Sequence, residues 1–249
     1  MKHERIGILG AIPEEINYII PLIENKREEK IGKRTFYIGK IGKHEVVLAY
    51  SRIGKVAAAT TVSTLILHYN ITQLIFTGVA GAIHPDVKIG DIVLARKLIQ
   101  HDMNASPLMP RHEIPLLGKT YFEVDTKLLE RSRKAANNTL LTNSFTEAEK
   151  DEFHLHHPTI HFGLIASGDL FFSTTKQKEK LNQRIQNILC VEMEGAAIAQ
   201  ICYEFSIPFC VMRVISDEAN DESSIDFVRF IKHVGRVYSR SFIENLLKK

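Results

Sequence analysis

Short apolar runs of strand length alternate with helical stretches along most of the chain. The apolar runs are rich in Ile, Val, Leu and Phe and are bounded by Gly, Pro or charged residues, a pattern typical of buried strands. Such strands are predicted at 6–9, 74–79, 91–95, 161–166, 188–193 and 208–215. Two further strands at 36–38 and 45–50, with Gly39 and Gly42 between them, are predicted to form a hairpin.

Helical patterns fill most of the intervals between these runs. Helices are predicted from Pro13, over 55–69, over 125–137, near 177–184, from Gly195 and from about Ser224. The alternation favours a single α/β domain over residues 1–249, with a central mixed β-sheet flanked by helices. The charged run 24–34 is predicted to be a solvated connection, and Lys232, Arg236 and Arg240, spaced by four, to form the solvent face of the last helix.

Composition narrows the classes of partner and compartment. The 32 Lys and Arg and 29 Asp and Glu residues give a net charge of +3, with no basic block interleaved with aromatics, so nucleic acid is not expected as a partner. Apolar runs are too short for a membrane helix or a signal peptide. Cys190, Cys202 and Cys210 are odd in number and lie in apolar segments, which indicates reduced thiols and a cytoplasmic protein.

The segment LCVEMEGAAIAQIC, residues 189–202, places Glu192 and Glu194 in an otherwise apolar stretch. An unpaired ionised carboxylate is costly to bury, so each needs a partner or a ligand. Glu194 follows a predicted strand, at the edge where open α/β sheets bind ligands. The alternative is a carboxylate that caps the following helix. Arg213, inside another apolar strand, is expected to pair with Glu194, and no role is assigned to Glu192.

Other candidate residues also follow predicted strands. Glu15, in GILGAIPEEI, either complements a helix dipole or acts as a general base. Asp217, in VMRVISDEAND, is either a helix N-cap or a proton donor. The aromatic pair of SGDLFF either stacks on a planar ligand or packs in the core. The histidines at 154, 156, 157 and 161 match no zinc motif, and no metal is predicted.

These motifs also occur in a recognisable order: GILGAIPEEI, SRIGKVAAA, FTGVAGAI, GDIVLA, QHD, SGDLFF, VEMEG and RVISDEAND. From about Ile6 to the C-terminus the chain resembles the 5′-methylthioadenosine/S-adenosylhomocysteine nucleosidases of the nucleoside phosphorylase superfamily. The resemblance implies a nucleoside phosphorylase-like domain, a homodimer without a cofactor and a role in methionine salvage. It implies hydrolysis of the bond between adenine and a 5′-thio-substituted ribose, with a small-molecule nucleoside as the partner.

The resemblance also implies residue roles. Glu15 would activate water, and Asp217, fixed by Ser216, would protonate adenine N7. Glu194 would accept hydrogen bonds from the ribose hydroxyls, with Arg213 orienting the carboxylate. The remaining contacts would be Met193 under the sugar, Phe171 stacked on adenine, the Phe172 backbone at its amino edge, and Ile12, Ile53 and Phe227 around the sugar and 5′ substituent.

Some positions depart from the family. Val79 stands beside the expected water where many of these nucleosidases have serine, and segment 101–118, with Ala105 and Leu108 expected in the partner subunit's pocket, has an unusual sequence. The phosphate-binding arginines of related phosphorylases are absent from GAIPEE and FTGVAG, so water is the expected nucleophile, although Arg52 lies nearby. Alternatives are an aminodeoxyfutalosine nucleosidase, a phosphate-dependent purine nucleoside phosphorylase and a non-catalytic nucleoside binder.

Overall fold

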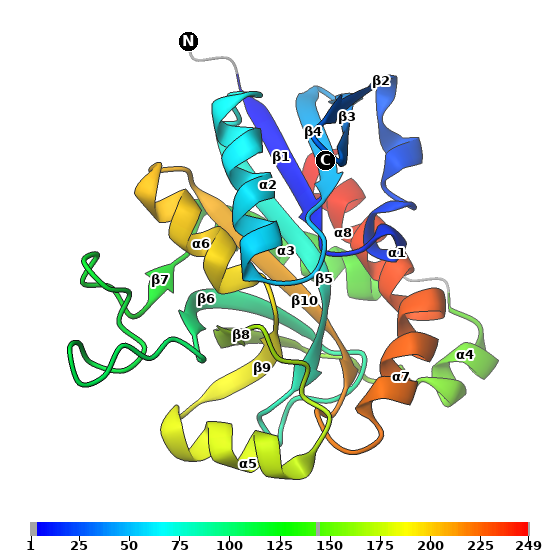
Figure 1. Cartoon of the computed structure of the whole chain (residues 1–249). Helices are drawn as coiled ribbons and strands as arrows, with labels where there is room; N and C mark the ends of the chain where they lie inside the picture. Colours follow the sequence, from blue (N-terminus) through cyan, green and yellow to red (C-terminus); the bar gives the residue numbers. More distant parts are fainter. Residues whose placement is uncertain (1–3, 143–144, 249) are drawn as a thin grey trace.

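The computed structural model describes residues 4–142 and 145–248, in which a ten-stranded mixed sheet is covered by helices (Figure 1). The strands are β1 (Arg5–Gly10), β2 (Glu24–Ile31), β3 (Arg34–Ile41), β4 (His44–Tyr50), β5 (Gln73–Ala82), β6 (Ile92–Gln100), β7 (Phe122–Glu123), β8 (Ile160–Ser167), β9 (Ile188–Glu192) and β10 (Phe209–Asp217). The helices are α1 (Pro13–Ile16), α2 (Lys55–Leu67), α3 (Thr126–Thr142), α4 (Glu147–Glu152), α5 (Thr175–Arg184), α6 (Gly195–Glu204), α7 (Ser223–Phe230) and α8 (Arg236–Leu247), with a 3₁₀ turn η1 (Ile20–Leu22) and a π-helical turn η2 (Ile231–Gly235).

Half of the sheet closes on itself. Strands β10, β6, β8, β9 and β5 follow one another, and β10 pairs again with β5, so these five strands form a ring. The open half continues from β5 through β1, β4, β3 and β2. Strands β4, β1, β5 and β10 run parallel to one another, so their carboxyl ends lie on the same side of the sheet.

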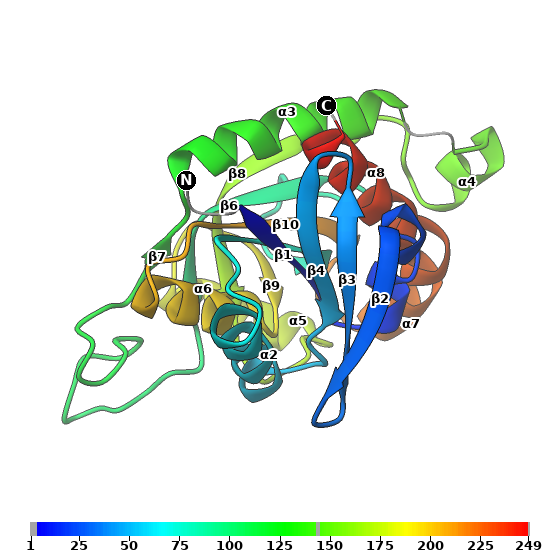
Figure 2. The same ribbon diagram turned by 90° about the horizontal axis from the view of Figure 1, so that it is seen from above.

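Helices cover both faces of the sheet (Figure 2). On one face, Val62 and Leu65 of α2 lie in the same apolar cluster as Ile198 and Cys202 of α6. On the other, α1, α3 and α8 enclose a second cluster with Tyr238 and Phe242 of α8 at its centre. Helix α5 lies beside the ring, where its Leu181 packs in a smaller cluster with residues of β8 and β9. Two-sided burial explains why the central strands are continuously apolar.

The predicted α/β domain with a central mixed sheet is confirmed, as is the 36–38 and 45–50 hairpin, which is the antiparallel pair β3 and β4. The prediction for 24–34 is wrong, because most of this run is strand β2, paired with β3. Its side chains are mostly exposed, as an edge strand rich in charge allows. Helix α4 and strand β7 were not predicted from the sequence pattern.

The last helix also differs from the expected solvent face. Lys232 is exposed, but Arg236 and Arg240 are half-buried. The Arg236 guanidinium lies 4.6 Å from the centre of the Tyr18 ring and donates a hydrogen bond to the Tyr18 hydroxyl. The aliphatic stem of arginine can cover apolar surface while its charge remains near water, so charge spacing alone does not define a solvent face.

Candidate active site

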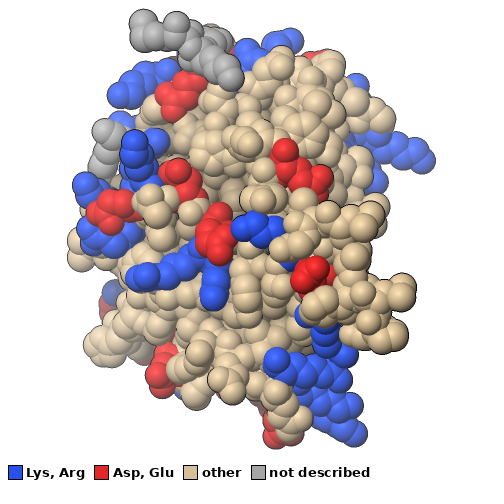
Figure 3. Space-filling view, turned by 90° about the vertical axis from the view of Figure 1, so that its left-hand side faces the viewer, with Lys and Arg blue, Asp and Glu red and all other residues tan. Residues whose placement is uncertain are grey.

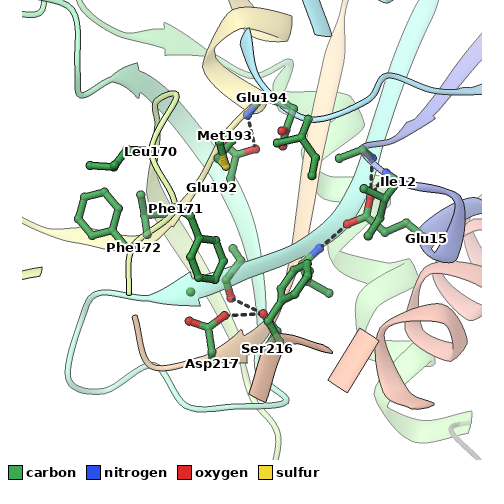
Figure 4. Close-up of a pocket in the computed structure, with 17 residues that line it drawn as sticks. Ile12, Glu15, Leu170, Phe171, Phe172, Glu192, Met193, Glu194, Ser216 and Asp217 are labelled. Carbon is green, nitrogen blue, oxygen red and sulfur yellow. Dashed lines mark hydrogen bonds between the residues drawn. The ribbon is translucent and has the colours of Figure 1, made fainter. Parts of the chain in front are cut away.

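A cavity of about 690 Å³, a volume that includes the open space at its mouth, opens where β1, β5, β9 and β10 end (Figure 4). Its lining residues are Ala11, Ile12, Glu15, Ile53, Val79, Ala80, Gly81, Leu170, Phe171, Phe172, Val191, Glu192, Met193, Glu194, Ser216, Asp217 and Phe227. Glu15, Glu194 and Asp217, the three carboxylates expected to converge, therefore face one cavity although they lie far apart in the sequence.

Glu15 is held from three directions by backbone amides. It lies in the one-turn helix α1 and is 3% exposed. Its Oε2 accepts hydrogen bonds from the amides of Ala11 and Ile12, and its Oε1 accepts one from the Val79 amide at 3.1 Å. Burial raises the pKa of Glu15 above its usual range, against the opposing effects of Arg213 and these amides. A buried carboxylate that is held rigidly in this way can act as a general base.

Glycine at position 78 allows this arrangement. A Cβ atom at Gly78 would overlap Glu15 Oε1 and would lie 2.7 Å from Arg213 Nη1. The sequence showed only a stretch of small residues there. The tertiary structure explains the glycine, because β5 lies beside Glu15 and Arg213 and leaves no room for a side chain at position 78.

Glu194 faces the cavity at the junction of β9 and α6. It is 4% exposed, and its Oε1 accepts a hydrogen bond of 2.8 Å from the Gly54 amide. Burial, with the charge of Glu192, raises the pKa of Glu194 to about 8. Among the described residues its side chain makes no capping hydrogen bond to α6. The helix-cap interpretation therefore does not apply to Glu194.

Glu192 has the structural role that the sequence left unassigned. Its carboxylate accepts hydrogen bonds from the Gly195 amide at 3.0 and 2.8 Å, from the Glu194 amide at 3.2 Å and from the Ser167 hydroxyl. The carboxylate therefore satisfies free amides at the start of α6, as acidic groups at helix N-termini commonly do.

The expected pairing of Arg213 with Glu194 is wrong. Arg213 Nη2 donates to Glu192 Oε2 at 2.7 Å, and the guanidinium stacks 3.7 Å from the centre of the Phe76 ring. Its Nε and Nη1 have no hydrogen-bond partner among the described residues. The pKa of Arg213 is raised because the nearby carboxylates, first Glu192, outweigh its burial. Sequence alone could not decide between two glutamates only two positions apart.

Asp217 lies on the opposite wall, at the end of β10. Its Oδ2 accepts a hydrogen bond of 2.8 Å from the Ser216 hydroxyl, and its Oδ1 accepts one of 2.9 Å from the Ala219 amide. A Cβ atom at Gly81 would lie 2.8 Å from Asp217 Oδ1, so glycine is needed there as well. Ser216 and Asp217 thus lie as the sequence analysis expects, within one hydrogen-bonded unit that faces the cavity (Figure 4).

Aromatic and apolar side chains form the rest of the lining. The rings of Phe171 and Phe227 meet edge to face with centres 5.9 Å apart, and Phe171 is 40% exposed. Phe172 is buried and its ring lies against His101, with centres 5.4 Å apart. Ile12, Ile53, Val79 and Met193 also line the cavity. The wall offers a surface on which a planar, largely apolar ligand can stack.

Several other residues considered in the sequence analysis lie outside this cavity. Ala105 and Leu108, predicted to reach the pocket of a partner subunit, do not line the cavity of their own chain, and Leu108 is 89% exposed on segment 101–118. Arg52 is exposed, and its Nη2 donates to the Lys33 carbonyl oxygen at 2.6 Å. His161 and His156 pair with Asp91 and Asp151. In the described ranges, 4–142 and 145–248, no three His, Cys, Asp or Glu side chains are arranged to hold a metal ion.

Comparison with known proteins shows the family of the chain. The sequence matches the Phosphorylase superfamily over residues 5–247. It is 35% identical to the 5′-methylthioadenosine/S-adenosylhomocysteine nucleosidase of Staphylococcus epidermidis, over 91% of this chain and 92% of that protein. The chain belongs to this nucleosidase family of the phosphorylase superfamily.

Two other relatives of this nucleosidase family are similar over nearly their full length. The Helicobacter pylori aminodeoxyfutalosine nucleosidase is 32% identical, over 98% of this chain and 100% of its own. The solved nucleosidase of Streptococcus pneumoniae, bound to a transition-state inhibitor, superimposes with a TM-score of 0.84 at 34% identity, covering 98% of each chain. The match over nearly the full length confirms the nucleoside phosphorylase-like fold.

Proposed function

We propose that this protein hydrolyses the N-glycosidic bond of 5′-methylthioadenosine and S-adenosylhomocysteine, releasing adenine and the thio-substituted ribose. The observation that carries the proposal is that Glu15, Glu194 and Asp217 line one cavity beside an aromatic wall. A binding protein has no need for both a base and an acid. Relatives that carry the nucleosidase name over more than nine-tenths of the chain support the same activity.

In the proposed mechanism, Glu15 removes a proton from water as the water attacks the anomeric carbon. The amides of Ala11, Ile12 and Val79 fix the carboxylate, so little reorganisation is needed during the reaction. Burial raises the pKa of Glu15, which makes its ionised form a stronger base. Arg213, whose Nη1 is unpartnered among the described residues, lies close enough to Glu15 to counter its charge.

Departure of adenine leaves positive charge on the ribose, as in the oxocarbenium-like transition states of glycoside hydrolysis. Glu194 would accept hydrogen bonds from the ribose hydroxyls. Without substrate, burial raises its pKa to about 8, and the positive charge that develops on the ribose would favour its ionised form, so the carboxylate would stabilise the transition state more than the ground state. Asp217 would donate a proton to adenine N7, since adenine leaves poorly as an anion. Ser216 would orient Asp217 through its 2.8 Å hydrogen bond.

The aromatic wall would bind the base and the apolar residues the sugar. Phe171 would stack on adenine, and Phe227 would pack edge to face against Phe171. The Phe172 backbone would contact the amino edge of the base. Met193 would pack beneath the ribose, and Ile12, Ile53 and Val79 would border the sugar and its 5′ substituent.

Water is favoured over phosphate as the nucleophile. None of the 17 described lining residues is Lys or Arg, and phosphate recognition in proteins relies strongly on such cations. Arg213 lies behind the lining and is already paired with Glu192. Arg52, the other candidate, binds the Lys33 carbonyl oxygen instead.

Aminodeoxyfutalosine is a second candidate substrate. Relatives named aminodeoxyfutalosine nucleosidases are 32–33% identical over 98% of this chain, close to the values for the other group. The reaction and the proposed roles of the three carboxylates would be the same, and only the 5′ substituent would differ.

Release of adenine tests the proposal. We expect the purified protein to release adenine from methylthioadenosine, S-adenosylhomocysteine or both, with no dependence on phosphate. Aminodeoxyfutalosine is assayed as a third substrate. Asp217→Asn should slow the release of adenine about 10²- to 10⁴-fold, because it removes the proposed proton donor. Phosphate-dependent turnover would support a phosphorylase, and nucleoside binding without any release would support the binder.

We further propose a homodimer that acts in the cytoplasm in methionine salvage. Large apolar side chains are exposed on neighbouring elements of one side: Val56 and Leu67 on α2, Tyr203 and Phe205 at the end of α6, and Leu108 and Leu116 on segment 101–118. Figure 3, which views this side, has acidic and basic side chains interspersed, with broad areas that carry neither. Such a surface suits a second copy of the chain, whose cavity Ala105 and Leu108 would then approach.

The three buried free cysteines support a reducing compartment.

A further inference from the structure

An ion-pair network outside the cavity connects the start of α2 with two loops. Lys55 Nζ donates to Asp102 Oδ1 at 2.7 Å and to Gln100 Oε1 at 3.2 Å. The other oxygen of Asp102 accepts a hydrogen bond of 3.0 Å from the Asp169 amide. Asp169 Oδ1 in turn accepts one of 2.8 Å from the Lys55 amide. The start of α2 is therefore tied to the segments that follow β6 and β8.

This network borders the residue that contacts Glu194. Gly54 immediately precedes Lys55, and its amide donates the 2.8 Å hydrogen bond to Glu194 Oε1. Gly54 has a φ of +97°, a conformation that side chains rarely adopt. A Cβ atom there would lie 3.0 Å from Asp169 Oδ1. The orientation of the Gly54 amide therefore depends on the hydrogen bonds that Lys55 makes with Asp169 and Asp102.

The components of the network are partly shielded from water. The side chain of Lys55 is 18% exposed and that of Asp102 is 30% exposed. Burial would raise the pKa of Asp102, but the hydrogen bonds from Lys55 and from the Asp169 amide outweigh burial and lower it. The carboxylate therefore stays ionised at neutral pH, and each of its oxygens has a separate donor.

We infer that Asp102 is a positioning residue that acts through Lys55 and Asp169 to hold the Gly54 amide against Glu194. This inference rests on the proposed function, in which Glu194 binds the ribose. Asp102 is absent from the described lining residues, so it acts without contact with the substrate. Loosening of the network lets the Gly54 amide move, and Glu194 then loses its fixed direction toward the sugar. Small displacements of a group that stabilises the transition state can cost about 10²-fold in rate.

The test is a double-mutant cycle with Asp102→Asn, Lys55→Met and the double variant, assayed on methylthioadenosine. We expect each single variant to lower kcat about 10- to 100-fold. The double variant should be no slower than the worse single variant, because both remove the same interaction. The dissociation constant for free adenine, which lacks the ribose, should change less than about 2-fold in every variant.

A matched control uses another lysine–carboxylate pair of the same length. Lys150 and Glu147 form a 2.7 Å ion pair on α4, outside the cavity and the network. Lys150→Met and Glu147→Gln should leave both kcat and the dissociation constant for adenine unchanged. If one of the network variants fails to fold, the other single variant and Asp102→Glu, which keeps the charge, still test the inference.

Hydrogen–deuterium exchange gives a readout that does not require turnover. Peptides that cover residues 52–57 should exchange faster in Asp102→Asn than in the wild type, whereas peptides over 147–152 should not change. Wild-type kcat in both single variants, additive losses in the double variant, or an equal loss of adenine binding would overturn the inference. If the wild-type protein releases no adenine, the proposed function is overturned instead. The inference about Asp102 is then tested by hydrogen exchange alone, and unchanged exchange of residues 52–57 in Asp102→Asn would refute it.

Discussion

Glu192 and Glu194 lie two positions apart and are both buried, yet their surroundings assign them different tasks. Glu192 accepts hydrogen bonds from two amides, from Ser167 and from Arg213. Glu194 accepts one, from Gly54, and faces the cavity. A carboxylate with a complete set of donors serves the structure, and one with free acceptor capacity can serve a ligand.

At the scale of the single residue, Glu15→Gln tests the proposed base. We expect kcat to fall about 10²- to 10⁴-fold, because an amide cannot accept the proton of water. Steady-state kinetics and calorimetric titration with adenine measure kcat and binding, and binding should be retained. Turnover at the wild-type rate would show that another group acts as the base.

The same substitution has an expected cost in stability. Both oxygens of Glu15 accept hydrogen bonds from backbone amides. In Glu15→Gln, the NH₂ group of the glutamine must therefore face one of these donors, and that hydrogen bond is lost. A lost buried hydrogen bond costs about 1–3 kcal/mol. Thermal melting therefore accompanies the kinetics, and activity is compared well below the midpoint of the variant.

The pKa of Glu194 predicts a pH dependence of stability. Burial, with Glu192, raises this pKa from 4.5 to about 8, so the folded protein keeps a proton that the unfolded chain releases. This contribution to stability is fully present below pH 4.5 and is lost as the pH rises to about 8. Without substrate, the free energy of unfolding of the wild type should fall over this range by about 1 kcal/mol or more beyond that of Glu194→Gln.

Urea denaturation at a series of pH values measures this difference. The variant is the control, because it keeps the shape of the side chain and cannot ionise. Parallel stability profiles of the two proteins would show that Glu194 ionises near its ordinary pKa.

At the scale of the element, the start of α6 depends on the side chain of β9. Glu192 supplies the acceptor for the first amides of the helix and simultaneously holds Arg213. The strand, the helix and the buried arginine are therefore fixed by one carboxylate.

Glu192→Gln should destabilise the protein by about 3–5 kcal/mol, because it leaves the charge of Arg213 buried and unpaired. It should also lower kcat/KM, since Arg213 lies beside Glu15 and Glu194. Chemical denaturation and steady-state kinetics measure the two effects. Glu130→Gln, which breaks the exposed Glu130–Arg133 pair, is the control and should change the unfolding midpoint little.

Elements differ in how far their own sequences predict them. The central strands are predictable because their side chains are buried on both faces, which leaves a continuous apolar run. Strand β2 is not, since its mostly exposed side chains resemble a solvated loop and its backbone partner is β3. Edge strands are defined by hydrogen bonds to a neighbour, and this information is not local.

At the scale of the whole molecule, the exposed apolar side chains of α2 predict association. Val56→Arg should weaken self-association about 10-fold or more, because it buries a charge in the proposed interface. Sedimentation equilibrium measures the mass as a function of concentration. Leu141→Arg is the control, because Leu141 is 83% exposed on α3, on the opposite face of the sheet. A monomeric wild type would contradict the dimer.

The described helices are all too short or too polar to cross a bilayer. The sequence by itself determined the α/β class, the family and the set of carboxylates at strand ends, because apolar periodicity and motif order are local properties. The tertiary structure decided which charges meet. Glu15, Glu194 and Asp217 reach one cavity only because β5 pairs with both β10 and β9. The same packing places Arg213 beside Glu192, with which it forms an ion pair. Coulombic attraction and desolvation depend on distances in space, which the order of residues along the chain leaves open.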